Sequence, residues 1–134
     1  MLLFDVRQSQ EPAGRIFKTA WFSKAARKAA IADEWLCVAV REVMLGQAVD
    51  LGGGVFKKRL NQNRHRAIRL TRAGRHWIFE YLFAKKDRDN IGTDELAAFR
   101  RLVRHYQTVT DAQFAQLLKD GDLTEICHDE TQPV

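Results

Sequence analysis

The sequence is poor in cysteine and proline and contains no long apolar run. Its two cysteines, Cys37 and Cys127, lie far apart and form neither a disulfide framework nor a metal-spaced cluster, so we expect reduced thiols and a cytoplasmic protein. No apolar run approaches the ~18 residues of a transmembrane helix, which excludes an integral membrane protein. The opening segment MLLFDVRQSQEP lacks the basic and apolar regions of a secretory signal peptide.

The chain does contain enough apolar residues for one compact domain. Of its 134 residues, 46% are hydrophobic and 10% are aromatic, a composition that argues against disorder. A domain of this size buries roughly two-thirds of its unfolded surface, so it needs neither disulfides nor a metal to fold. We predict a single domain over residues 15–128, followed by an acidic tail at 129–134. Residues 1–14 read as a loose extension, either a functional arm or the product of a misassigned start codon.

Positive charge is concentrated in the middle of the chain. The net charge of +5 divides into +1 over residues 1–56, +9 over 57–104 and −5 over 105–134. The stretch 57–75 contains eight Lys or Arg residues and no acid. Local pairing cannot neutralise such a stretch, so it indicates a polyanion or an acidic protein as partner. The alternative is a solvated basic face without a partner.

The hydrophobic pattern predicts an α+β domain of the order β-α-α-β-β-β-α-α. In chain order we expect a strand at 15–19, helices at 24–30 and 33–45, strands at 55–60, 66–71 and 75–84, and helices from 93 and at 111–119. Ser23, Asp33 and Thr93 are the expected N-terminal caps of the first three helices. The three consecutive strands form a small antiparallel sheet, with the helices packed on it. The nearly all-apolar segment HWIFEYLFA is its expected central strand, covered on both faces.

Cations are expected to converge on one region of this sheet. Lys57 and Arg59 are two residues apart in a strand and therefore project from the same face, whereas Lys58 takes the opposite one. Further candidates for contact with an anion follow across the hairpin and after the central strand, namely Arg66, Arg69, Lys85, Lys86 and Arg88. Guanidinium groups bind phosphate through paired hydrogen bonds, and Lys adds a point charge.

Other features have a structural interpretation beside a functional one. The glycine triplet at 52–54 opens a strand and not a helix, which favours a flexible turn over a phosphate-binding loop. His65, at the basic hairpin, is either a proton-transfer group or an exposed turn residue. We predict neither a metal site nor a cofactor, because no His or Cys pair has the spacing of metal ligands. The tryptophans Trp21, Trp35 and Trp77 are expected in the core.

Three phrases of the sequence, FKTAWFSKAARK, DLGGGVFKKRL and FAKKDRDNI, carry a resemblance to a known family. In this order and spacing they resemble the RelE/ParE superfamily of toxins from type II toxin–antitoxin systems, most closely its RelE/HigB-like branch. RelE-like toxins are small basic ribonucleases that cut mRNA in the ribosomal A site. The resemblance therefore implies a RelE/ParE-like fold and an mRNA interferase, a metal-independent endoribonuclease that inhibits translation.

The resemblance also implies particular site residues. The intervals between the cations of RelE, transferred to this chain, give Lys57, Arg59, Arg66 and Lys86 as catalytic residues. Lys58, Arg69, Lys85 and Arg88 are the further expected RNA-binding residues. RelE has a tyrosine at the position that corresponds to Gly92. The HigB type instead has histidine and acidic residues near its site, for which His65, Asp87 and Asp89 are candidates by proximity.

The expected partners also follow from the resemblance. They are mRNA, the ribosome and a cognate antitoxin with a DNA-binding domain; no membrane is expected. Two alternative functions stay open at this point. One is a ParE-like inhibitor of DNA gyrase that acts without catalysis, and the other is a plain nucleic-acid-binding module.

Overall fold

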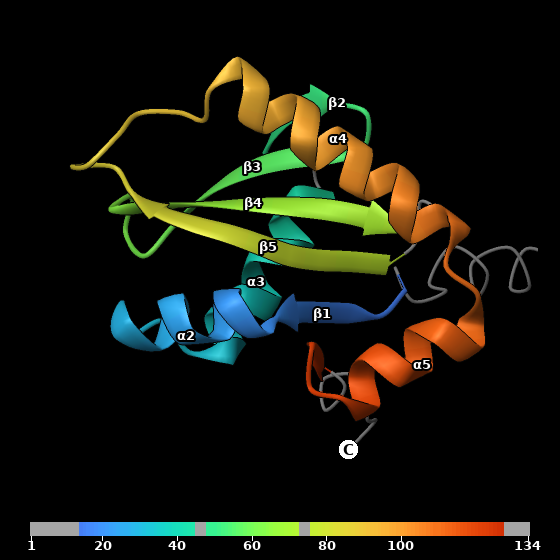
Figure 1. Cartoon of the computed structure of the whole chain (residues 1–134). Helices are drawn as coiled ribbons and strands as arrows, with labels where there is room; N and C mark the ends of the chain where they lie inside the picture. Colours follow the sequence, from blue (N-terminus) through green and yellow to red (C-terminus); the bar gives the residue numbers. More distant parts are fainter. Residues whose placement is uncertain (1–13, 45–47, 73–75, 128–134) are drawn as a thin grey trace, which may run out of the picture.

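The computed structural model describes residues 14–44, 48–72 and 76–127. Over these residues the chain forms one six-stranded sheet and four helices (Figure 1). In chain order the elements are β1 (Ile16–Thr19), α2 (Ala20–Lys28), α3 (Asp33–Met44), β2 (Val49–Gly52), β3 (Val55–Leu60), β4 (His65–Arg72), β5 (His76–Ala84), α4 (Thr93–Thr108), α5 (Asp111–Lys119) and β6 (Leu123–Ile126). The predicted α+β class is confirmed.

The sheet has the strand order β2-β3-β4-β5-β1-β6. Neighbouring strands are antiparallel, except that β1 runs parallel to β5. β1 pairs with β5 from Trp77 to Phe79, so the second half of β5 has no strand beyond it among the described residues, and α2 packs there instead. This free edge of β5 lies at the same end of the sheet as the β3–β4 hairpin and the segment that leads to α4 (Figure 1).

Both faces of the sheet are covered by helices. On one face, Phe22 of α2 and Leu36 of α3 pack with Phe79 and other sheet residues into one apolar cluster. On the other face, Val103 of α4 and Phe114 of α5 pack in a second cluster. The central position of β5 agrees with its apolar sequence, because a strand covered on both faces buries alternate side chains in both clusters.

The predicted strands at 55–60, 66–71 and 75–84 are present within a residue at most ends, and α5 has the predicted bounds. The second helix of the domain begins at Asp33 as expected, whereas the first begins at Ala20, four residues before the predicted start. The reason is its cap: the Thr19 hydroxyl, not that of Ser23, accepts the hydrogen bond from the free N–H of Phe22 at 3.0 Å. The helix at 93 is preceded by Gly92 as its cap residue.

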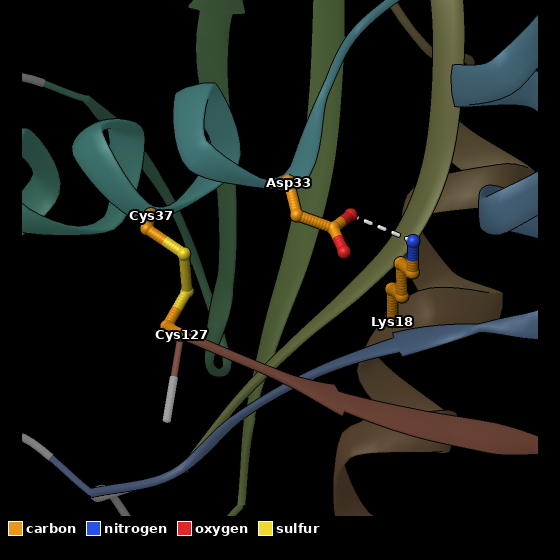
Figure 2. Close-up of a disulfide and its surroundings, with 4 residues drawn as sticks. All are labelled: Lys18, Asp33, Cys37 and Cys127. Atoms are coloured by element: carbon orange, nitrogen blue, oxygen red, sulfur yellow. Dashed lines mark hydrogen bonds and ion pairs between the residues drawn. A yellow bond between two sulfur atoms is a disulfide. The ribbon is translucent and has the colours of Figure 1, made fainter. Parts of the chain in front are cut away.

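Cys37 and Cys127 form a disulfide, so the expectation of reduced thiols is wrong. β6 pairs with β1 and packs in the same apolar cluster as α3. The Cα atoms of Cys37 and Cys127 therefore lie 5.6 Å apart. Figure 2 shows this bridge between α3 and the end of β6, near the ion pair of Lys18 with Asp33 at 2.7 Å. The sequence does not indicate this pair, because only the last strand, β6, brings Cys127 back to α3.

The glycine triplet forms the turn between β2 and β3. All three glycines have positive φ, from +67° to +88°, a region that favours glycine. α4 packs closely against this turn: a Cβ at Gly53 would lie 2.8 Å from Cγ of Arg100, and one at Gly54 would lie 2.8 Å from Cγ1 of Val103. The Arg100 guanidinium donates hydrogen bonds to the carbonyls of Leu51 and Gly52. Close packing with α4 thus explains the triplet.

The predicted N-terminal extension (residues 1–14) and acidic tail (129–134) lie outside the described residues, except for Gly14. None of the described helices combines the length and apolar character that a membrane span requires.

Candidate functional site

Three cations from β3 and β4 share the face of the sheet on which α4 packs. Arg59 and Arg66 are direct cross-strand partners, and Lys57 lies opposite Ile68, a core residue of that same face. Directly paired residues project to the same side of an antiparallel sheet. The predicted convergence of these three residues is therefore present. We call Lys57, Arg59 and Arg66 the cationic face.

Arg66 is the most firmly held member of the cationic face. Its side chain is buried, and its Nη1 donates hydrogen bonds to the carbonyl oxygens of Asn63 and His65, both at 3.1 Å. Asn63 belongs to a hairpin turn in which residues 61–63 have left-handed φ values of +54° to +71°. Asn tolerates this region better than most residues. The turn thus presents carbonyl groups that orient the guanidinium.

A fourth cation, Arg88, joins the cationic face from the segment between β5 and α4. Its guanidinium lies 5.5 Å from the ring centroid of Phe83, and Phe83 is the β5 partner of Arg66. Asn90 connects this segment to β3, because its side chain accepts a hydrogen bond from Nζ of Lys57 at 3.2 Å and its carbonyl accepts one from Nε of Arg88 at 2.9 Å. Arg88 and Lys57 are therefore bound to the same residue.

Glu95 holds Arg88 at the start of α4. The Arg88 guanidinium donates two hydrogen bonds to the carboxylate, one of them 3.1 Å long, and the Gly92 N–H donates a third at 2.7 Å. The bonds from Arg88, and then that from Gly92, lower the pKa of Glu95. The carboxylate thus fixes Arg88 and the first turn of α4 together, and it compensates the charge of Arg88.

The cationic face itself has no acidic counterpart. Within the described ranges, no carboxylate forms an ion pair with Lys57, Arg59 or Arg66. Some other cations of the chain do have such a partner, as in the ion pair of Arg15 with Glu125 at 2.7 Å. Uncompensated positive charge on a rigid sheet attracts a polyanion such as a nucleic acid backbone.

Two predicted RNA-binding residues lie on the opposite side of the sheet. Nζ of Lys58 forms an ion pair with Glu42 of α3 at 2.9 Å. Arg69 is fully buried, with its guanidinium 4.6 Å from the Trp77 ring centroid and 5.4 Å from that of Phe79. Burial leaves Arg69 no surface for direct contact with RNA, which corrects its assignment. Its position three residues after Arg66 accounts for this, because successive strand side chains alternate between faces.

His65, Lys85 and Lys86 form a second group beyond the hairpin. His65 directly precedes Arg66 in β4 and so points to the other face. Lys85 and Lys86 are exposed, and with His65 and Arg64 they line a cavity of about 680 Å³. Desolvation lowers the pKa of His65 below 6.5, and the charges of Arg64 and Lys86 lower it further against the opposing effect of Asp87. The neutral form of the His65 imidazole is thereby favoured.

The expectation of three core tryptophans holds only for Trp77, which is partly buried in the α2/α3 cluster. Trp21 of α2 is 53% exposed and Trp35 of α3 is 64% exposed. Phe83, Asn90 and Glu95 also contribute to the site, although they were not among the predicted residues. Only the spacing of Glu95 from Gly92 at a helix start offered a signal, since an acidic side chain there is favoured by the free N–H groups.

This arrangement suits the stabilisation of a phosphate group. Three side chains with fixed positive charge stand together on strands and at a hairpin, where the backbone limits their movement. The described residues include no group of three or more His, Cys, Asp or Glu placed to hold a metal ion. The guanidinium and ammonium groups of the cationic face are able to bind and polarise phosphoryl oxygens.

Comparison with known proteins gives a match to one family model. The model described as "RelE toxin of RelE / RelB toxin-antitoxin system" matches residues 14–126. No curated protein and no solved structure matches the chain.

Proposed function

The chain belongs to the RelE family of toxins from toxin–antitoxin systems, and we propose that it is an endoribonuclease that cuts mRNA on the ribosome and thereby inhibits translation. The single observation that carries this proposal is the cationic face. Lys57, Arg59 and Arg66 lie side by side, and no carboxylate of the described residues forms an ion pair with them, which suits an RNA phosphate. The resemblance to the HigB-like branch supports the same reaction.

The proposed reaction uses the RNA itself as the nucleophile. The ribose 2′-oxygen forms a bond to the adjacent phosphorus while the bond from phosphorus to the 5′-oxygen of the next nucleotide breaks. The products are a 2′,3′-cyclic phosphate and a 5′-hydroxyl, so the proton lost by the 2′-hydroxyl is balanced by one gained on the leaving oxygen. The protein then has to position the phosphate and stabilise the charge that develops on it.

We assign these tasks to the members of the cationic face. Arg66, oriented by the hairpin carbonyls, stabilises the negative charge on the pentacoordinate phosphorus. Lys57 or Arg59 favours deprotonation of the 2′-hydroxyl or steadies the leaving oxygen. Arg88 is better placed than Lys86 to supply a further cation, because it lies against Phe83 beside Arg66. Lys85 and Lys86 then contact the RNA backbone beyond the hairpin, near His65.

Membership of the family implies an antitoxin partner. We propose that the antitoxin covers the cationic face with an acidic or apolar segment and carries a DNA-binding domain. Because translating ribosomes are the proposed site of action, the proposal places the protein in the cytoplasm. The reductants of the cytoplasm favour reduction of the disulfide between Cys37 and Cys127.

The proposal is tested by mapping mRNA 5′ ends in a purified translation reaction. Wild-type protein is expected to create new ends in translated mRNA only. Arg66→Ala is expected to lower the cleavage rate about 100- to 1,000-fold, the usual effect of removing one preorganised donor from a charged transition state. Arg104→Ala, which removes an exposed guanidinium from α4, is the matched control and is expected to cleave normally. Melting curves establish that both variants are folded.

Three results would contradict the proposal. Cleavage by Arg66→Ala at the wild-type rate would show that the cationic face takes no part in the reaction. Intact mRNA with wild-type protein, together with inhibited DNA supercoiling, would instead establish a gyrase inhibitor. Intact mRNA with weak, steeply salt-dependent binding of any RNA or DNA would establish a nucleic-acid-binding module.

A further inference from the structure

An exposed aromatic side chain borders the cationic face at the free edge of β5. Trp21 of α2 is 53% exposed and stacks on Tyr81, with ring centroids 5.0 Å apart and an interplanar angle of 25°. The tyrosine ring in turn contacts Phe99 of α4 and Phe83 of β5. Trp21 is thus held by a row of aromatic rings while half of its surface stays open to solvent.

A cavity lies beside this tryptophan and reaches the cationic face. It has a volume of about 400 Å³, and its lining includes Trp21, Lys28, His65, Phe83 and Arg88. Phe83 is the cross-strand partner of Arg66, and Arg88 lies over the Phe83 ring. The cavity therefore begins where the cationic face ends, and its lining combines aromatic rings with cations and with the carboxylate of Asp87.

We propose that this cavity binds a nucleobase of the RNA, in one of the two nucleotides that flank the cleaved phosphate, by stacking on Trp21. The inference rests on the proposed function and makes Trp21 a positioning residue for that reaction. Single-stranded RNA is bound where aromatic rings accept unstacked bases beside cations that follow the backbone. Lys28, which lines the same cavity and forms no ion pair among the described residues, carries a charge that attracts a neighbouring phosphate.

The structure also explains why the other exposed tryptophan is a suitable control. Trp35 lies on α3 and lines a different cavity, which includes Arg59 but none of the residues that line the cavity at β5. No ring contact involves Trp35 among the described residues. Trp35→Ala therefore removes the same side chain from a helix surface without touching the cavity at β5.

The first experiment measures cleavage of mRNA on stalled, programmed ribosomes by Trp21→Ala, Trp21→Phe and Trp35→Ala. Loss of one stacked base lowers binding by roughly 1–3 kcal/mol, that is about 5- to 150-fold, so the cleavage rate of Trp21→Ala is expected to fall by a factor in that range. Trp21→Phe keeps an aromatic ring and is expected to retain most of the activity. Trp35→Ala is expected to cleave at the wild-type rate.

The second experiment replaces the base and leaves the protein unchanged. An mRNA with an abasic nucleotide on one side of the cleaved phosphate, or on the other, is offered to wild-type protein and to Trp21→Ala. At one of the two positions, the abasic nucleotide is expected to lower the cleavage rate of wild-type protein. This decrease should equal the decrease that Trp21→Ala causes on intact mRNA. The variant is expected to show no further loss there, because the base and the indole then act as one interacting pair.

The outcomes separate this inference from the proposed function. Wild-type protein that cleaves mRNA while Trp21→Ala cleaves at the same rate and the same sites would overturn base stacking alone. Independent losses from the abasic nucleotide and from Trp21→Ala would also overturn it. Unchanged cleavage with weakened antitoxin binding would instead make the cavity a protein-docking surface. If wild-type protein cleaves no mRNA, the proposed function fails and this inference fails with it.

Discussion

Replacement of the buried Arg69 with Met is expected to stabilise the fold. Arg69 is fully buried, and none of its guanidinium nitrogens has a hydrogen-bond partner among the described residues. Met has a similarly long, unbranched side chain and carries no charge, so it can occupy the same space without requiring hydrogen bonds. Replacing buried charges by well-packed apolar residues is often neutral or stabilising by 1–4 kcal/mol.

The magnitude follows from two opposing contributions. Burial lowers the pKa of Arg69 far below its usual range, to about 9, which corresponds to roughly 5 kcal/mol against the charged form in the folded protein. The guanidinium lies 4.6 Å and 5.4 Å from the ring centroids of Trp77 and Phe79, and each such contact returns about 0.5–2 kcal/mol. The net cost of the charge is therefore about 1–4 kcal/mol, and Arg69→Met should raise the free energy of unfolding by that amount.

Urea unfolding at pH 7, followed by circular dichroism and tryptophan fluorescence, measures this difference. Arg69→Lys is the control because it keeps the charge and loses the planar stacking on Trp77, so it should be no more stable than wild type. A free energy of unfolding for Arg69→Met more than about 1 kcal/mol below wild type would refute the reasoning. The contacts of the guanidinium would then outweigh its desolvation.

Two further predictions concern stability. Burial raises the pKa of Glu80 to about 7, against the opposing hydrogen bond from Tyr106, so the folded state holds a proton that the unfolded state releases above about 4.5. The free energy of unfolding should therefore fall by up to about 3 kcal/mol between pH 4.5 and pH 8, and thermal melts of Glu80→Gln should lack this component. Reduction of the disulfide opens a loop of 90 residues and should lower the unfolding free energy by up to about 4 kcal/mol. Urea unfolding with dithiothreitol measures this effect, and a Cys37→Ser/Cys127→Ser double variant should not respond.

Much of the fold could be predicted because long elements have clear patterns. The apolar run of β5 and the helical spacing of α3 each extend over many residues, so single exceptions do not hide them. β2 and β6 were missed because each is four residues long, and VDLG and LTEI carry no sustained alternation. Their positions depend on pairing with β3 and β1, which is a tertiary property.

The site could be predicted only where the alternation of side chains along a strand decides which face of the sheet a residue occupies. Lys57, Arg59 and Arg66 share a face because of the alternation of β3 and the register of the hairpin. The same alternation separates His65 and Arg69 from Arg66, so their positions follow from the strand assignment itself. Arg88 differs, since a turn in which its N–H bonds to the Ala84 carbonyl at 3.3 Å directs the chain after β5. No periodic pattern indicates that geometry.

The tryptophans show a limit of composition as a guide to burial. Trp21 and Phe22 are neighbours in α2, but only Phe22 is fully buried, because the helix begins at Ala20 and this sets which side chains point inward. A large apolar side chain left exposed beside a charged cavity is informative, whereas a buried one is ordinary. The prediction that Trp21 lies in the core is wrong, and its exposed ring beside the cavity is well placed to contact a ligand.

In the part of the chain that the structure describes, no carboxylate forms an ion pair with Lys57, Arg59 or Arg66. Like charges directly opposite each other in a sheet are destabilising, so Arg59 beside Arg66 has a cost that one acidic residue would relieve. The chain supplies acids at comparable positions elsewhere: Glu42 pairs with Lys58 on the other side of β3, and Glu95 pairs with Arg88 next to the site. Lys58 and Arg88 thus have an acidic partner, whereas Arg59 and Arg66 have none among the described residues. An anion bound at the cationic face would supply the negative charge that relieves their repulsion.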